Sequence, residues 1–157
     1  MPMKSIVFPG MSLTACEGWE DTTGLVQGND APFTVTKAAA GVGALQFSPA
    51  IYERGERPEP TLEDLSKMLR EFAANHQLGD SFEQTVVTGE LFGIGASYHR
   101  EDDFIRVWYL SNGWSFLLVT YVCEWESRHV EVSEREQMVS SIRLQSSTTE
   151  RMDRKGG

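Results

Sequence analysis

Histidine and cysteine side chains supply many of the metal ligands and many of the catalytic nucleophiles in proteins. The chain contains His76, His99, His129, Cys16 and Cys123. No two histidines are four residues apart, as a zinc site on a helix requires, and neither cysteine adjoins a histidine. The cysteines have neither CxxC spacing nor the density of a disulfide scaffold. We therefore expect no metal and no cofactor.

Recognisable catalytic motifs are also missing. Cys123 lies in an apolar run, so we expect a buried thiol that packs as a small hydrophobic group. The nucleophile motif GxSxG is absent, because the nearest string, residues 93–97, places both glycines before its serine. Three adjacent acids at 101–103 are more typical of a solvated turn than of a catalytic carboxylate pair. The sequence therefore predicts no catalytic residues and no enzymatic activity.

Acidic residues flank tryptophan at two places and form a third cluster at a charged turn. An aromatic anchor beside carboxylates suits a protein interface, where the ring is desolvated and the carboxylates meet basic groups. Alternatively, each tryptophan packs onto the core and its acidic neighbours face water. The residues predicted to bind a partner are Trp19, Glu20, Asp21, Glu101, Asp102, Asp103, Glu124, Trp125 and Glu126.

Two of these clusters flank the stretch that organises the chain. Residues 104–123 contain two apolar runs around the sequence Ser-Asn-Gly at 111–113. Asn-Gly between β-rich runs predicts a hairpin, because a type I′ turn needs positive φ at both central residues. A two-residue turn would pair Trp108 with Leu117, and a three-residue loop would pair Trp108 with Phe116. Both registers place apolar side chains on both faces, so we expect central strands covered on both sides.

One cover is a helix predicted over residues 61–78. Thr61 and Asp64 form a pair like a capping box, although aspartate stands where Glu or Gln is usual. Apolar residues recur at spacings of three and four and form one stripe along this segment. Gly79 is placed to end the helix in a left-handed conformation.

The second cover is a shorter helix predicted over residues 133–143. Ser133 and Glu136 have the spacing of a capping box, and Arg135 should face water. The remaining residues, 145–157, contain almost no apolar side chains, so we expect a disordered tail after a single domain over 1–144.

The rest of the chain predicts short strands. They lie at 4–8, 11–16, 25–27, 33–36, 43–53, 82–87 and 91–98. Gly93 and Gly95 fall on one face of the last of these strands, which indicates close approach of another backbone or a large aromatic ring. Pro49 marks an edge or a bulge, because proline cannot donate to a ladder. The order of elements predicts an α+β fold, with helices packed on a mostly antiparallel sheet.

Composition limits the function classes. The 157 residues include 14 Lys and Arg against 23 Asp and Glu, which gives a formal net charge of −9. Nucleic acid and anionic membrane are therefore unsuitable direct partners, whereas a basic protein is a suitable one. No apolar run reaches the roughly 18 residues that span a bilayer. The first ten residues do not resemble a signal peptide, so we expect a cytoplasmic protein.

The C-terminal half resembles the end of PsbP-like domains. The matching segments are residues 104–109, Gly113, 117–123, 133–136 and the Val-Ser-Ser-Ile-Arg run at 139–143. Those domains end in a long hairpin and a capped helix with a similar terminus. Over residues 62–144 the resemblance implies a curved antiparallel sheet between helices. The group includes photosystem accessory proteins, Ran-binding proteins, bacterial lipoproteins and Eag-type chaperones of type VI secretion, most of which bind proteins. No functional residue of the family carries over to this chain.

These observations favour a non-enzymatic, cytoplasmic protein-binding module. Such a module could be a bacterial immunity protein or a secretion-effector chaperone, with a basic toxin or a secreted effector as partner. One alternative is a small-ligand binder or enzyme with a pocket between sheet and helix, where Gly93 and Gly95 make room near Tyr98 and His99. Another is a structural or assembly subunit that forms a homodimer.

Overall fold

The computed structural model describes residues 3–24, 32–51 and 58–144. Its strands are β1 (Lys4–Phe8), β2 (Met11–Ala15), β3 (Trp19–Asp21), β4 (Phe33–Lys37), β5 (Gly43–Ala50), β6 (Phe82–Val87), β7 (Phe92–Arg100), β8 (Asp103–Ser111), β9 (Phe116–Glu124) and β10 (Arg143–Leu144). Its helices are α1 (Leu62–Asn75), the short 3-10 helix η1 (Trp125–Ser127) and α2 (Val132–Ser140). The strands form a seven-stranded sheet in the order β3-β4-β5-β9-β8-β7-β6 and a three-stranded sheet in the order β1-β2-β10.

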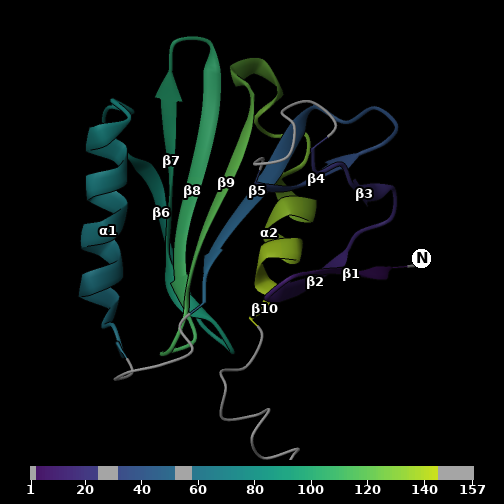
Figure 1. Ribbon diagram of the computed structural model, residues 1–157. Helices are drawn as coiled ribbons and strands as arrows, with labels where there is room; N and C mark the ends of the chain where they lie inside the picture. Colours follow the sequence, from purple (N-terminus) through teal and green to yellow (C-terminus); the bar gives the residue numbers. More distant parts are fainter. Residues whose placement is uncertain (1–2, 25–31, 52–57, 145–157) are drawn as a thin grey trace, which may run out of the picture.

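The predicted central hairpin is β8 and β9, in the middle of the large sheet. Figure 1 shows α1 on one side of this sheet, and α2 with the small sheet on the other. Trp108 packs with Met138 of α2 in one core, whereas Val107 packs with Leu69 and Ala73 of α1 in a second core. Trp108 and Val107 are both fully buried. The predicted α+β class, with strands covered on both sides, is confirmed.

The register of the hairpin differs from both predicted registers. Trp108 pairs with Val119, and a four-residue loop over 112–115 joins the strands. The Asn112 side chain closes this loop, because its Oδ1 accepts hydrogen bonds from the backbone N–H groups of Trp114 and Ser115. The register lies two residues from that of the two-residue turn. A shift of two preserves the alternation of faces, so the predicted division of side chains between the faces still holds.

The start of α1 is as predicted, but its end is not. Thr61 and Asp64 form a complete capping box, in which each side chain accepts a hydrogen bond from the other residue's backbone N–H. The helix ends at Asn75, because Gln77 adopts the left-handed conformation with φ of 55°. The N–H of Leu78 then donates to a carbonyl of the last turn, in the pattern of a Schellman motif. Gly79 also has positive φ, but it lies beyond this motif.

The predicted capping box of α2 is wrong. Helix α2 begins one residue earlier than predicted, so Ser133 lies inside it, and the N-cap residue Glu131 makes no side-chain capping bond. The carboxylate of Glu136 instead contacts two arginines, Arg106 and Arg135. Arg135 does not face water, because only 4% of its surface is exposed. The helix ends at Ser140, and β10 then pairs with β2.

Other sequence predictions have mixed outcomes. Pro49 lies in an internal strand, β5, but it falls beyond the pairing of β5 with β4, so no ladder bond to β4 is lost. The predicted strand at 25–27, residues 52–53 of another, and the tail at 145–157 lie outside the described residues. None of the described helices is long and apolar enough to cross a membrane.

Candidate functional site

Trp19 cannot serve as the predicted surface anchor. Its side chain is fully buried in the larger core, and its strand β3 pairs with β4 at the edge of the sheet. Glu20 and Asp21 are exposed. The alternative interpretation, in which the tryptophan packs inward while its acidic neighbours face water, is therefore correct for this cluster.

The other two predicted clusters lie together at one end of the sheet. The turn between β7 and β8 carries Glu101 and Asp102, and the chain leaves β9 through Glu124 into η1. The backbone N–H of Trp125 donates to the Asp102 carbonyl at 2.8 Å, which ties the two segments together. We call this surface the acidic tip. It consists of Glu101, Asp102, Asp103, Glu124, Trp125 and Glu126, and its five carboxylate residues are all exposed.

The acidic tip is hollowed and strongly negative. A hollow of about 470 Å³ lies among Glu101, Asp102, Glu124 and Glu126, with Trp125 in its lining. Asp103 and Glu124 are register partners directly opposite each other on β8 and β9. Like charges in directly opposed positions destabilise a sheet. Asp103 lies between a like charge, Glu124 on β9, and an opposite charge, Arg100 on β7.

The indole of Trp125 is half-buried and packs against neighbouring side chains of the same chain. The His99 ring stacks on the indole with 3.6 Å between centroids, and the guanidinium of Arg128 lies 3.9 Å from the indole centroid. Phe82 and Phe104 contact the indole at tilted or edge-on angles. The chain's own side chains therefore pack against this ring, and the carboxylates are the groups that the tip offers to a partner.

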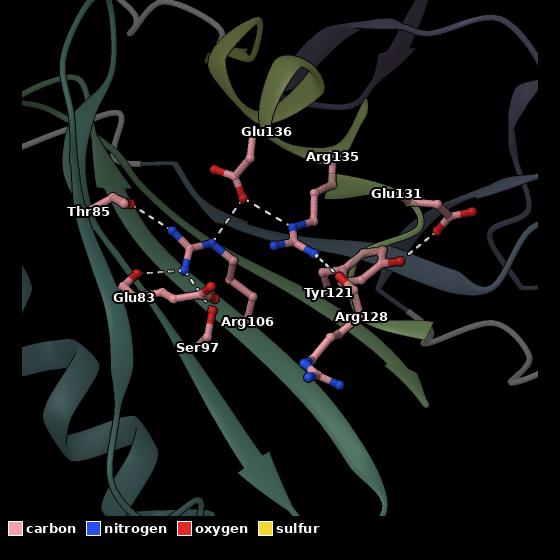
Figure 2. Close-up of polar contacts among 9 residues, drawn as sticks. All are labelled: Glu83, Thr85, Ser97, Arg106, Tyr121, Arg128, Glu131, Arg135 and Glu136. Atoms are coloured by element: carbon pink, nitrogen blue, oxygen red, sulfur yellow. Dashed lines mark hydrogen bonds and ion pairs between the residues drawn. The ribbon is translucent and has the colours of Figure 1, made fainter. Parts of the chain in front are cut away.

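A second hollow lies beside the acidic tip. It has a volume of about 470 Å³ and lies between β6, β8 and α2. Its lining includes Thr85, Phe104, Arg106, Arg128, Arg135 and Glu136. We call it the arginine cleft, and Figure 2 shows its polar contacts.

Arg106 is fixed at the base of the arginine cleft. Only 2% of its surface is exposed, and its Nη1 donates to Ser97 Oγ at 2.8 Å and to the Glu83 carbonyl at 2.9 Å. Its Nη2 donates to Thr85 Oγ1 at 2.7 Å. An irregularity in β6 between Phe82 and Thr85, with Glu83 at a φ of 53°, brings two of these acceptors to the guanidinium. Burial lowers the pKa of Arg106, and the charge of Glu136 opposes that shift.

Arg135 projects from α2 toward Arg106. Its Nη1 donates to the Arg128 carbonyl at 3.1 Å, and its guanidinium lies 5.0 Å from the centroid of the Phe104 ring. Its Nε lies 3.1 Å from Glu136 Oε2, and the Nε of Arg106 lies 3.0 Å from the same oxygen. The N–H of Arg106 is not aligned with that oxygen, so this second contact is an ion pair only. Two buried guanidinium groups therefore share one carboxylate oxygen (Figure 2).

A buried hydrogen bond lies behind Arg135. The hydroxyl of Tyr121 donates to Glu131 Oε1 at 2.6 Å, and Glu131 Oε2 accepts from the backbone N–H of Val42 at 3.1 Å. Burial, followed by the bond to Glu131, raises the pKa of Tyr121 well above its usual value. Cys123 is buried, as predicted, and burial raises the pKa of its thiol.

A hollow of about 440 Å³ lies between α1 and the sheet, and its lining includes Tyr98 but neither of the two predicted glycines, Gly93 and Gly95, nor His99. Close approach is confirmed at both positions: a Cβ at Gly93 would meet the Tyr109 carbonyl, and a Cβ at Gly95 would lie 2.5 Å from the Trp108 indole. Tyr98 and His99 cannot line one pocket, because successive strand residues point to opposite faces. Tyr98 packs in the core under α1, and His99 stacks on Trp125.

Arg106 and Arg135 were not predicted from the sequence as site residues. One signal was available: Arg106 stands inside an apolar strand, on the face that also carries Trp108 and Leu110. A charge on such a face must be paired or must line a site. Arg135 gave no comparable signal, because a charged residue in an amphipathic helix normally faces water.

Comparisons with known proteins support the fold. No protein-family model and no curated protein matches this sequence. A crystal structure of a protein from Bacteroides thetaiotaomicron VPI-5482 matches with a TM-score of 0.61 and 13% identity, over 93% of this chain and 50% of that protein. The solution structure of cyanobacterial PsbP (CyanoP) from Synechocystis sp. PCC 6803 matches with a TM-score of 0.57 and 12% identity, over 92% of both chains.

These matches establish a PsbP-like fold. They agree with the resemblance found in the C-terminal half of the sequence and extend it over nearly the whole chain. This chain spans about half the length of the Bacteroides protein. At this level of identity the likeness shows the fold alone.

Proposed function

We propose that this chain is a non-enzymatic protein-binding module whose acidic tip binds a basic surface of a partner protein. The observation that carries the proposal is the direct opposition of Asp103 and Glu124, joined to Glu101 and Asp102 through the Trp125–Asp102 hydrogen bond. A module selected for stability alone would avoid this opposition. A basic partner would instead turn it into binding energy and specificity.

The partner class follows from charge. With a net charge of −9, the chain would attract a basic protein from a distance and accelerate its association. We propose a cytoplasmic bacterial immunity protein that neutralises a basic toxin, or a chaperone for a secreted effector. Both roles need rapid and specific capture, and neither needs catalysis.

Site-specific crosslinking tests this proposal. A photo-crosslinking residue replaces Glu126 in the acidic tip or, as a matched control, Glu71, an exposed glutamate on α1. The captured protein is then purified and titrated with the wild-type chain and with a Glu101→Gln/Asp102→Asn/Glu126→Gln variant. Capture at position 126 alone, with affinity lost in the variant, supports the proposal. Equal capture at both positions, or unchanged affinity, contradicts it. Hydrolysis of general ester, peptide or phosphate substrates would contradict its non-enzymatic part.

A homodimeric assembly subunit is a second candidate. Strand β6 is an edge of the large sheet, and 58% of the Val86 surface on it is exposed. Edge strands offer unpaired backbone groups to a second copy. Light scattering decides this candidate: a dimer mass that Val86→Lys converts to a monomer mass supports it, and a monomer mass for the wild-type chain excludes it.

A further inference from the structure

We propose that the arginine cleft binds a small organic carboxylate with an apolar body, and that Glu136 occupies the anion position when no ligand is bound. This site adjoins the acidic tip, because Arg128 lines the cleft and lies against Trp125 of the tip, but its ligand is of a different class from the proposed protein partner. The charge, the geometry and the lining of the cleft each support such a ligand.

The charge of the cleft is opposite to that of the chain. The chain has 14 basic residues against 23 acidic ones, yet Arg106, Arg128 and Arg135 line this hollow with two glutamates, Glu83 and Glu136. Glu83 is exposed and offers Arg106 its backbone carbonyl. The buried carboxylate of Glu131 accepts hydrogen bonds from Tyr121 and from the Val42 N–H. The charge of Glu83 also acts on Arg106, but Glu83 is exposed, so Glu136 is the carboxylate in contact with both buried guanidinium groups.

This imbalance is costly without a further anion. A buried charge is tolerated when it is paired, and removal of its partner is strongly destabilising. The burial of Arg106 already lowers its pKa, and the neighbouring charge of Arg135 lowers it further. A second carboxylate between the guanidinium groups would relieve both penalties.

The geometry is prepared for such a ligand. Three hydrogen bonds hold the Arg106 guanidinium, and the bond to the Arg128 carbonyl holds that of Arg135. Fixed guanidinium groups bind carboxylates through parallel N–H donors with little loss of entropy. By contrast, 39% of the Glu136 side chain is exposed, so it can turn outward to admit a ligand.

The lining defines the rest of the ligand. Phe104 and Val132 contribute apolar surface beside the arginines, and Thr85 contributes a hydroxyl that accepts a hydrogen bond from Arg106. A volume of about 470 Å³ lies within the range of pockets that enclose a small molecule. The cleft therefore fits a carboxylate joined to a short apolar chain better than it fits a bare inorganic anion.

Calorimetric titration with octanoate tests the inference. The wild-type chain should bind octanoate saturably, and 1-octanol and sodium sulfate should not compete with it. Glu136→Gln removes the internal anion, so it should bind octanoate about tenfold more tightly than the wild-type chain does. Arg135→Met keeps the apolar stem and should lose binding by at least about tenfold, whereas Arg70→Met, at an exposed arginine of α1, should not.

Specific results would overturn the inference. They are the absence of saturable binding to both the wild-type chain and Glu136→Gln, equal competition by octanol, or weaker binding to Glu136→Gln. Circular dichroism checks that each variant is folded. If Arg135→Met does not fold, the gain in affinity of Glu136→Gln still decides the question, because a merely structural Glu136 would produce no gain. A negative octanoate result would not contradict partner binding by the acidic tip, since the crosslinking test measures a protein bound through the exposed carboxylates of that tip.

Discussion

The indole of Trp108 fills the space in which a side chain at position 95 would stand. The two residues are register partners on β8 and β7, and a Cβ on Gly95 would lie 2.5 Å from Trp108 Cδ1. The same position would lie 3.2 Å from the Nη2 of Arg106. Gly95 therefore supports both the core and the base of the arginine cleft.

Gly95→Ala should destabilise the fold by about 1–3 kcal/mol, because an added methyl group overpacks a rigid core. Urea unfolding measures the change. Trp108→Phe lowers stability by itself but makes room, so the double variant should be more stable than the sum of the two single effects predicts. Strict additivity would show that the indole does not enforce glycine at this position.

Removal of the Tyr121 hydroxyl should lower the free energy of unfolding, because the buried carboxylate of Glu131 would lose a hydrogen-bond donor. Tyr121→Phe takes one hydrogen bond from a carboxylate that is almost fully buried, so the free energy of unfolding should fall by about 1–3 kcal/mol. The folded chain raises the pKa of Tyr121, so above about pH 10 this tyrosine ionises more readily in the unfolded chain than in the folded one. Its contribution to stability should therefore be constant below about pH 10 and fall as the pH rises further. Tyr121→Phe should weaken that alkaline loss, and thermal melts between pH 8 and pH 11 would detect it as a smaller slope than that of the wild-type chain. Part of the slope should remain, because burial also raises the pKa of Tyr98, Tyr109 and Cys123.

The capping box of α1 should contribute stability that disappears in acid. Hydrogen bonds from the Thr61 backbone and side chain hold the pKa of Asp64 below its usual value. The contribution is therefore present above about pH 4 and is lost as the pH falls through the lower folded-state pKa. Thr61→Ala should reduce stability by about 1 kcal/mol at pH 7. Thr61→Ser retains the cap, so an equal loss in that variant would contradict the capping role.

Charge reversal in the acidic tip should separate stability from binding. Glu124→Lys replaces a like-charge opposition with an opposite-charge pair across from Asp103, so stability should rise by about 0.5 kcal/mol. The same change should weaken binding of a basic partner. Glu71→Lys on α1 is the control, because it changes the net charge by the same amount away from the acidic tip. A loss of stability in Glu124→Lys would show that the opposition is not a strain on the fold.

Local patterns in the sequence predicted the frame of the molecule. Apolar side chains on both faces of the predicted hairpin placed β8 and β9 at the centre, and the spacing of Thr61 and Asp64 predicted the start of α1. These features depend on neighbours along the chain, and a register shift of two does not disturb them. The loop itself was not predicted, because the Asn112 side chain closes a longer turn than Asn-Gly usually makes.

The candidate sites were predicted only in part, because they depend on contacts between distant segments. The sequence marked the acids around residues 101–103 and 124–126, but only the fold joins them and leaves Trp19 in the core. Glu136 has the correct spacing for a capping box with Ser133. Two arginines engage it instead, and one of them, Arg106, lies on a strand that precedes α2.

The most direct test of the central claim is the affinity of the crosslinked and purified partner for the chain, measured as ionic strength rises. Binding to the wild-type chain should weaken with salt, and Glu101→Gln/Asp102→Asn/Glu126→Gln should lower the affinity about tenfold and flatten the salt dependence. A variant that binds as tightly as the wild-type chain, with the same salt dependence, would contradict a partner-binding role for the acidic tip.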